Sequence, residues 1–240
     1  MISSVQQFFT ALLDVILPPI CHICHSFIPQ AGTLHICPTC REKLPLVSSP
    51  LCGIPFIGAG DDHQCGACLI NPPHFDAARA HFIYEGAIRE LIHSFKYDRR
   101  THLRYPLALL ALEGAHCFME YTPEIIVPVP LHTSRLRQRG FNQAVLLGTT
   151  LSRHLSLPMV PDALVRTRPT EPQINLSAAE RKLNVQGAFS VKRSDEIKGR
   201  NVLLLDDVMT TGSTMDECAK VLKKAGAATV VAVTVARTAR

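Results

Sequence analysis

The stretch that decides the fold is Val202-Leu-Leu-Leu-Asp206-Asp207-Val-Met-Thr210-Thr211-Gly212-Ser213-Thr214. Its apolar run predicts a buried strand, which fixes where the two carboxylates emerge. The hydroxyl-rich turn that follows starts a helix, where main-chain N–H groups can hold a phosphate. Two carboxylates beside such a turn suit a phosphorylated ribose, because this ligand offers both a diol and a phosphate. Asp216 and Glu217 stand three residues after Ser213 and Thr214, as in a capping box, and support the helix start.

Strands and helices alternate on both sides of this stretch. Apolar and β-branched segments predict strands at 77–84, 124–130, 201–205 and 228–236. Helical periodicity predicts helices at 86–97, 101–119, 141–155 and 213–225. This alternation is typical of an α/β fold with a parallel sheet and helices on both faces, whose ligands bind at the carboxyl ends of the strands.

A basic segment follows the strand predicted at 124–130. It reads Leu131-His-Thr-Ser-Arg135-Leu-Arg137-Gln-Arg139-Gly140-Phe141-Asn142-Gln143. Arginine suits bidentate contact with phosphate, so Arg135 and Arg139 are candidate ligands of a diphosphate. A basic loop that only faces water is the alternative. Lys96, Arg99 and Arg100 form a second basic patch that could face the same pocket.

The stretch 202–214 resembles the phosphoribosyl diphosphate (PRPP) motif of type I phosphoribosyltransferases, in which apolar residues, two acids and a Thr-Gly-x-Thr loop follow one another. The resemblance implies that Asp206 and Asp207 bind the ribose hydroxyls. It also implies Mg²⁺ on the diphosphate and ribose oxygens, a nitrogen nucleophile, and arginines that stabilise the departing diphosphate. The 5′-phosphate would be held by Thr210, Thr211, Gly212, Ser213 and Thr214. Transferases for 6-oxopurines have an acid where this chain has Thr210, which argues against a 6-oxopurine acceptor.

Seven of the nine cysteines lie between Cys21 and Cys68, which marks a separate module. The pairs Cys21-x-x-Cys24 and Cys37-x-x-Cys40, twelve residues apart, have the spacing of the two knuckles of a zinc ribbon. They predict a closed tetrahedral Zn²⁺ site that holds together a segment too small to fold on its own core. Disulfides or unligated thiols are the alternatives, and a cytosolic location disfavours disulfides.

A second cysteine cluster, Cys52, Cys65 and Cys68, looks like another ribbon with one ligand absent, because Ser49 stands where the fourth cysteine would be. His63 could supply that ligand and complete a Cys3His zinc site, and Asp62 is a weaker candidate. A histidine that only faces solvent is the alternative.

Together these features resemble the ComF family, also called GntX-like, in which a double zinc ribbon precedes a type I phosphoribosyltransferase domain. Residues 127–143 are similar to its characteristic stretch. Residues 173–189 resemble its flexible active-site loop, on which Arg181 could close over the site. The resemblance implies links to nucleotide metabolism and to natural competence, with single-stranded DNA and DNA-uptake proteins as partners. We expect an amphipathic helix at 1–19, the double ribbon at 20–72 and the transferase domain at 73–240.

Composition limits the classes of function. Hydrophobic residues make up 47% and charged ones 19%, which predicts a globular chain rather than a disordered one. The chain has no apolar run long enough for a membrane span, and no Lys or Arg precedes Arg41, so we expect a cytoplasmic protein. The net charge is −3 over residues 1–76 and +8 over residues 77–240. This basic excess indicates an anionic partner for the second domain.

Two functions fit these observations. The first is an enzyme that transfers phosphoribosyl to or from a base or nucleotide. The second is a non-catalytic protein that uses the PRPP pocket as a sensor, or as a phosphate-binding platform for single-stranded DNA in an uptake complex.

Overall fold

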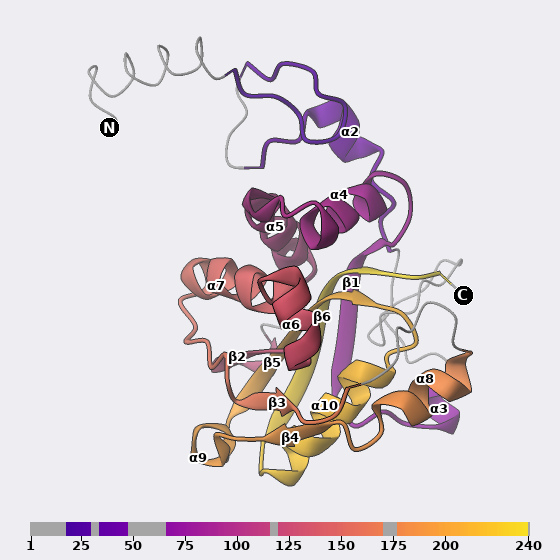
Figure 1. The fold of residues 1–240 in the computed structure, drawn as a ribbon, viewed down its shortest axis with the longest axis vertical. Helices are drawn as coiled ribbons and strands as arrows, with labels where there is room; N and C mark the ends of the chain where they lie inside the picture. Colours follow the sequence, from indigo (N-terminus) through magenta and orange to yellow (C-terminus); the bar gives the residue numbers. More distant parts are fainter. Residues whose placement is uncertain (1–17, 30–33, 48–65, 116–119, 170–176, 240) are drawn as a thin grey trace. The chain divides into compact units, whose positions relative to one another are not determined.

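A computed structural model of the chain describes residues 18–29, 34–47, 66–115, 120–169 and 177–239 (Figure 1). The chain separates into two compact units, Met1–Leu44 and Pro45–Arg240. The helix expected at 1–19 lies outside the described residues except for Pro18 and Pro19. The candidate ligands Cys52, His63 and Cys65 also lie outside them. Within the described ranges, no helix combines the length and the apolar character that a membrane span requires.

The first unit is built from short turns around its cysteines. Ile20 and Phe27 form an antiparallel bridge, and the turn between them is closed by the N–H of His25, which donates to the carbonyl of Cys21 at 3.0 Å. Helix α2 (Pro38–Glu42) follows Cys37 directly, with proline in its first turn. The buried apolar residues described in this unit are few: Cys21, Ile28, Ile36 and Leu44. So small a core is typical of modules that depend on a metal for stability.

The second unit contains a parallel sheet in the order β1-β6-β5-β2. The strands are β1 (Ala77–Ile83), β2 (Ile125–Pro128), β5 (Asn201–Met209) and β6 (Thr229–Arg237). β5 continues past the predicted end at Leu205, with Asp206 paired to Thr234 and Met209 to Arg237. The two acids are therefore strand residues and do not follow the strand, so their side chains face opposite sides of the sheet.

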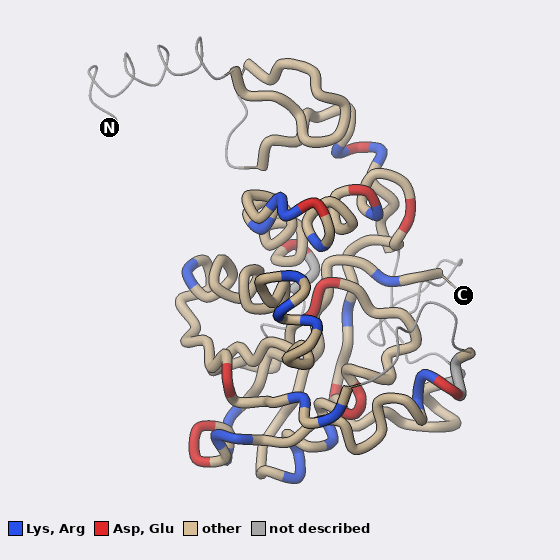
Figure 2. Tube along the Cα trace, viewed as in Figure 1, with Lys and Arg blue, Asp and Glu red and all other residues tan. Residues whose placement is uncertain are grey.

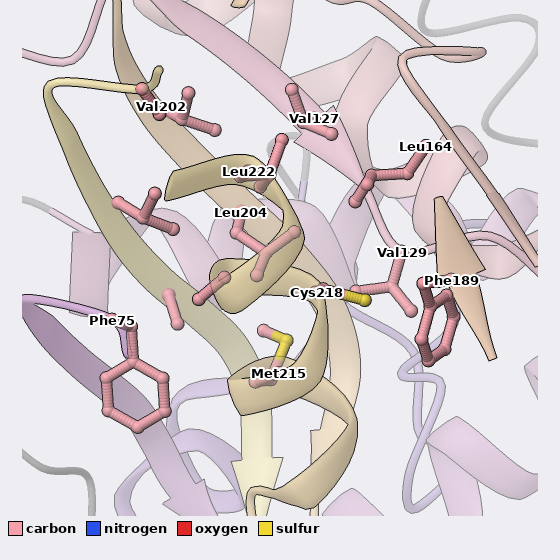
Figure 3. Packing of buried hydrophobic residues seen from close by; sticks show 14 of the residues in the cluster. Phe75, Val127, Val129, Leu164, Phe189, Val202, Leu204, Met215, Cys218 and Leu222 are labelled. Carbon is pink, nitrogen blue, oxygen red and sulfur yellow. The ribbon is translucent and has the colours of Figure 1, made fainter. Parts of the chain in front are cut away.

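Helices cover both faces of the sheet, as predicted (Figure 1). α5 (Arg104–Ala115) and α7 (Gln143–Leu155) pack on one face, with α4 (Gly86–Tyr97) and the short 3₁₀ helix η1 (Thr101–Leu103) beside α5. Gly148 of α7 faces Leu205 on this side, where a Cβ on Gly148 would stand 3.4 Å from the Leu205 methyl. α10 (Ser213–Lys224) covers the other face, where Cys218 and Leu222 pack with Val202 and Leu204 (Figure 3).

A two-stranded antiparallel hairpin, not predicted from the sequence, joins the α10 side of the core. It consists of β3 (Leu164–Arg166) and β4 (Phe189–Val191). Leu164 and Phe189 pack in the same cluster as Val129 and Cys218 (Figure 3). α8 (Ala178–Val185) occupies part of the segment expected to be a flexible loop, and Ser177 and Glu180 form a capping box at its start. The remaining helices of this unit are α3 (Gly66–Ile70), α6 (Thr133–Arg139) and α9 (Ser194–Ile197).

A short segment that leads into the second unit lies along the outer edge of β1. Leu46 forms an antiparallel bridge with Phe82. The N–H of Val47 donates to the carbonyl of His81 at 2.9 Å, and the N–H of Ile83 donates to that of Pro45 at 2.8 Å. The edge strand of the sheet therefore has a backbone partner along this part of its length.

Candidate functional site

The acidic pair lies near the carboxyl end of β5, and its two members have different surroundings. Asp206 is half-buried on the α10 face, and its Oδ1 accepts the main-chain N–H of Asp207 at 2.8 Å. Asp207 is 2% exposed on the other face, where its Oδ2 lies 2.9 Å from Nζ of Lys96 on α4. The structure therefore brings both predicted acids to the same edge of the sheet, but engages one of them with a lysine.

Asp206 and Lys96 both have shifted pKa values. Burial, and then the charge of Asp207, raises the pKa of Asp206 to about 7, against a partial offset from Lys96. Burial acts to lower the pKa of Lys96, yet that pKa is raised overall because the charge of Asp207 favours the ammonium form. Near neutral pH, the Asp206 carboxyl is therefore close to its own pKa and can gain or lose a proton.

The hydroxyl-rich turn connects β5 to α10, and all five of its residues, 210–214, are half-buried. Gly212 is the N-cap of α10 and has φ +81°, in the left-handed region that favours glycine. A Cβ at this position would meet only Met209 Sδ, at 3.6 Å, so the backbone conformation requires the glycine. Thr211 Oγ1 lies 2.9 Å from Ser213 Oγ and accepts the N–H of Ser213 at 3.4 Å. The turn thus presents hydroxyls and N–H groups at a helix start, as a phosphate site requires.

The predicted capping box of α10 is wrong. The N-cap is Gly212, which has no side chain to cap with. Asp216 instead accepts the main-chain N–H of His74 at 2.6 Å and contacts its ring Nδ1 at 2.9 Å. Glu217 accepts the N–H of Gly187 at 2.9 Å. Both acids therefore fasten other segments to α10 and do not cap it.

The basic segment after β2 forms a helix, α6, for which no element was predicted. His132 caps its start by accepting the N–H of Ser134 at 3.3 Å, and Gly140 ends it with φ +86°. Arg135 and Arg139 are four residues apart and therefore share one face, where both are half-buried. Arg137 points elsewhere and is exposed. The arginines make α6 a basic helix (Figure 2).

Several contacts hold α6 in place between β2 and α4. Arg139 Nη1 donates to Gln143 Oε1 at 2.6 Å, and its guanidinium lies 5.2 Å from the ring centre of Tyr97. Asn142 donates to the carbonyl of Val129 at 3.0 Å and caps α7 by accepting the N–H of Ala144. α4 therefore contacts the site through two consecutive residues: Lys96 reaches Asp207 and Tyr97 reaches Arg139. Arg99 and Arg100, expected to form a patch with Lys96, are exposed.

Sequence reasoning missed Arg166, at the end of β3. Its guanidinium lies 5.1 Å from the ring centre of Phe189, its partner across the hairpin. Burial, and then the charge of Arg135, lowers its pKa, so these two arginines from separate elements are near each other. The charge of Asp206 acts on Arg166 in the opposite direction. The sequence feature that could have indicated Arg166 is its position two residues from Arg168, shortly before the loop expected at 173–189.

The expected loop residues Arg181 and Lys182 lie on α8, half-buried and exposed respectively. Arg168 donates through Nη2 to the carbonyls of Asn184 and Gln186, at 3.1 and 3.0 Å, and so binds the end of α8. Residues 170–176 are outside the described part of the chain.

The first unit carries the predicted zinc ligands in one cluster. Sγ atoms of Cys21, Cys24, Cys37 and Cys40 all lie within 4.8 Å of one another. The N–H groups of Ile23 and Cys37 each donate to Cys21 Sγ at 3.4 Å, which favours a thiolate. This donor set fits a structural Zn²⁺. Of the second cluster, only Cys68 is described; it lies half-buried on α3.

Comparisons with known proteins agree with this two-part organisation. Residues 12–69 match the family model of the double zinc ribbon domain, and residues 142–240 match that of the phosphoribosyl transferase domain. DNA utilization protein YhgH of Escherichia coli (strain K12) is 37% identical over 222 residues, covering 89% of this chain and 95% of that protein. Competence protein F of Haemophilus influenzae is 36% identical and covers 81% of this chain and 89% of that protein.

A more distant relative spans the same length. Competence protein ComFC of Bacillus subtilis is 28% identical over 241 residues, covering 91% of this chain and 95% of that protein. Both modules and nearly the full length of these relatives are therefore present. The chain belongs to the ComF family, with a double zinc ribbon ahead of a phosphoribosyltransferase domain.

Proposed function

We propose that this protein binds PRPP with Mg²⁺ and transfers its phosphoribosyl group to or from a base or nucleotide. The observation that carries the proposal is the meeting of Asp206 with the turn 210–214 at one end of the parallel sheet. A carboxylate can accept hydrogen bonds from ribose hydroxyls, and the turn offers hydroxyl and N–H donors to the 5′-phosphate.

Arginines on two elements suit the diphosphate. Arg135 and Arg139 share the half-buried face of α6, and the charge of Arg135 reaches Arg166 on β3. Positive charges held together in a partly buried site repel each other, and an anion bound between them lowers the energy of this repulsion. In the transfer, the bond between the anomeric carbon and diphosphate breaks as the nitrogen nucleophile attacks, and these guanidinium groups would stabilise the leaving charge.

Mg²⁺ fits this arrangement as an ion bound together with PRPP. Among the described residues, the cysteines of the first unit form the one cluster of three or more metal-binding side chains, so the described transferase domain has no cage of its own for a cation. Mg²⁺ typically takes most of its ligands from substrate phosphates and water. When bound, it would neutralise charge on the diphosphate.

The names of the relatives suggest the process. One is called a DNA utilization protein and two are called competence proteins. We therefore propose a role in handling imported DNA or the nucleotides derived from it. A non-catalytic platform for single-stranded DNA is the second candidate, and the exposed side chains of Arg99, Arg100 and Arg137 favour it, because exposed arginines on neighbouring elements can follow a phosphate backbone.

Calorimetry with PRPP and Mg²⁺ tests the first function. Asp206→Asn should weaken PRPP binding about tenfold or more, because a charged hydrogen-bond acceptor is lost. Arg166→Gln should weaken the binding of inorganic diphosphate by a similar factor. Asp195→Asn and Arg200→Gln are matched controls, since Asp195 is exposed on α9 and Arg200 pairs with Glu124 beside the amino end of β5. An unmodified protein that binds neither ligand would refute the proposal.

Turnover and DNA binding separate the two candidates. Release of diphosphate from PRPP in the presence of a panel of bases and nucleotides, lost in Asp206→Asn, supports the enzyme. Salt-dependent binding of single-stranded DNA that survives Asp206→Asn but is lost when Arg99, Arg100 and Arg137 are changed to Gln together supports the platform.

A further inference from the structure

The two acids of β5 belong to different faces of the sheet. Asp206 follows Val202 and Leu204 in the alternation of the strand, and these pack beneath Cys218 and Leu222 of α10. Asp207 follows Leu203 and Leu205, and Leu205 faces α7. The two carboxylates therefore leave the strand in opposite directions and have different surroundings.

Asp207 is closed off from a ligand by its surroundings. It is 2% exposed, and its carboxylate forms an ion pair with Lys96 at 2.9 Å. Only 16% of the Lys96 side chain is exposed. A ribose hydroxyl could reach Asp207 only by displacing the ammonium, which would leave a buried charge without its partner. Asp206, in contrast, is half-buried and adjoins the side of the sheet from which the phosphate turn continues into α10.

We propose that Lys96 is a positioning residue that holds Asp207 away from the sugar, so that Asp206 is the carboxylate that accepts the ribose diol. This inference rests on the proposed function and narrows it to one member of the acidic pair. Lys96 also acts on Asp206 through its charge. Its neighbour Tyr97 contacts Arg139, so the last turn of α4 supports both the sugar side and the diphosphate side of the site.

Charged and titratable groups reach Asp206 from four elements. Asp207 lies beside it on β5, Lys96 comes from α4, Cys218 from α10 and Arg166 from β3. Asp207 raises the pKa of Asp206 and Lys96 lowers it. Removing Lys96 alone should therefore shift the ionisation of Asp206 to higher pH. Removing both partners takes away two opposing effects and should leave that ionisation nearly where it is.

The test uses the full chain with zinc present and ribose 5-phosphate as the probe. Its variants are Asp206→Asn, Lys96→Met, Asp207→Asn and the double variant Lys96→Met/Asp207→Asn, with Lys198→Met as an exposed control. Binding is measured by calorimetry from about pH 6 to 8.5, a range around the Asp206 pKa of about 7. Melting temperature is measured alongside.

Asp206→Asn should lose about tenfold or more in affinity without loss of melting temperature. Each single change at Lys96 or Asp207 should lower both melting temperature and affinity, because it leaves a buried charge unpaired. The double variant should bind ribose 5-phosphate about tenfold more tightly than the weaker of the two single variants. Lys96→Met should also move the rise of affinity to higher pH. The ligand titrates equally in all variants, so this shift reports on the protein.

The outcomes distinguish a failure of this inference from a failure of the proposed function. A wild-type chain that fails to bind ribose 5-phosphate refutes the proposed function itself. If the wild type binds but the double variant is as weak as Asp207→Asn, or Asp206→Asn binds normally, Asp207 is a sugar ligand and the inference is overturned. An unshifted pH profile in Lys96→Met also overturns it. If a single variant does not fold, the affinity of the double variant for ribose 5-phosphate is compared with that of the wild type. A loss of affinity as large as that of Asp206→Asn then counts against the inference.

Discussion

Glu217 of α10 accepts the main-chain N–H of Gly187 at 2.9 Å, a contact that spans thirty residues of sequence. Gly187 lies in the turn between α8 and β4, and Glu217 lies one turn inside α10, which begins in the turn 210–214. Nζ of Lys220 is 3.4 Å from the other carboxylate oxygen of Glu217. The hairpin that carries Arg166 is thus joined to α10 by a charged hydrogen bond.

Glu217→Ala should lower the free energy of unfolding by about 1–2 kcal/mol, because it removes this bond from a buried position. Amide exchange should speed up in β4 more than in β6. Urea unfolding and hydrogen exchange measure the two effects. Glu196→Ala, which removes an exposed ion pair with Arg193, should change stability by less than about 0.5 kcal/mol. If amide exchange in β4 is equally fast in Glu217→Ala and Glu196→Ala, the hydrogen bond between Gly187 and Glu217 does not hold the hairpin.

Gly212→Ala should destabilise the fold by about 1–2 kcal/mol, because it forces an alanine to adopt φ +81°. Gly199, at φ +74° with no atom near its missing Cβ, gives a matched control, since Gly199→Ala introduces similar strain far from the turn. Thermal unfolding should show a similar loss for both. Only Gly212→Ala should also weaken ribose 5-phosphate binding, and equal affinities in the two variants would argue against a phosphate site here.

The raised pKa of Asp206 predicts how stability depends on pH. Its value of about 7 in the folded protein exceeds the ordinary 3.8, so the folded state holds this proton more tightly than the unfolded state does. The resulting stabilisation is complete below about pH 4 and is lost as pH rises to about 7. Asp206→Asn, which cannot ionise at this position, should therefore be more stable than the wild type at pH 8.

That difference should shrink toward pH 4. Urea unfolding of the wild type and Asp206→Asn across this range measures it, with Asp195→Asn as an exposed control. Two parallel stability curves would mean that Asp206 ionises with an ordinary pKa.

Zinc content tests both cysteine clusters. Cys24→Ser should remove one Zn²⁺ per chain and unfold the first unit, because few apolar residues there are buried. His63→Ala should remove a second Zn²⁺ if the Cys3His prediction is right. Metal analysis of purified protein gives the count, and circular dichroism reports the fold. A His63→Ala protein that keeps the full zinc content would assign the fourth ligand elsewhere.

Much of the transferase domain follows from local sequence patterns. β1, β6, α4 and α10 match their predicted ranges closely, because long apolar strands and amphipathic helices carry strong periodic signals. The hairpin of β3 and β4 was missed because each strand has three residues, too few for a period to show. α6 was missed because its residues are mostly polar, so no apolar stripe marks it as a helix.

Residue types and spacing selected the candidate residues of the site but not the directions of their side chains. They indicated the acidic pair, the turn 210–214 and the arginines Arg135 and Arg139. The direction of Asp207 depends on β5 continuing to Met209, and that continuation depends on pairing with β6, which is a tertiary effect. Arg166 depends on the fold of the hairpin for the same reason. The capping-box pattern at Asp216 and Glu217 was misleading because partners distant in sequence engage both carboxylates.

The backbone contacts of Pro45, Leu46 and Val47 with β1 affect how this protein can be shortened for experiments. Deleting the chain up to and including Val47 would remove these contacts. The edge of β1 beside the buried Phe82 would then be exposed. An exposed edge strand can pair with strands of other molecules. A fragment intended to isolate the phosphoribosyltransferase domain should therefore begin before Pro45. A fragment that begins after Val47 should aggregate at concentrations where the longer fragment stays soluble.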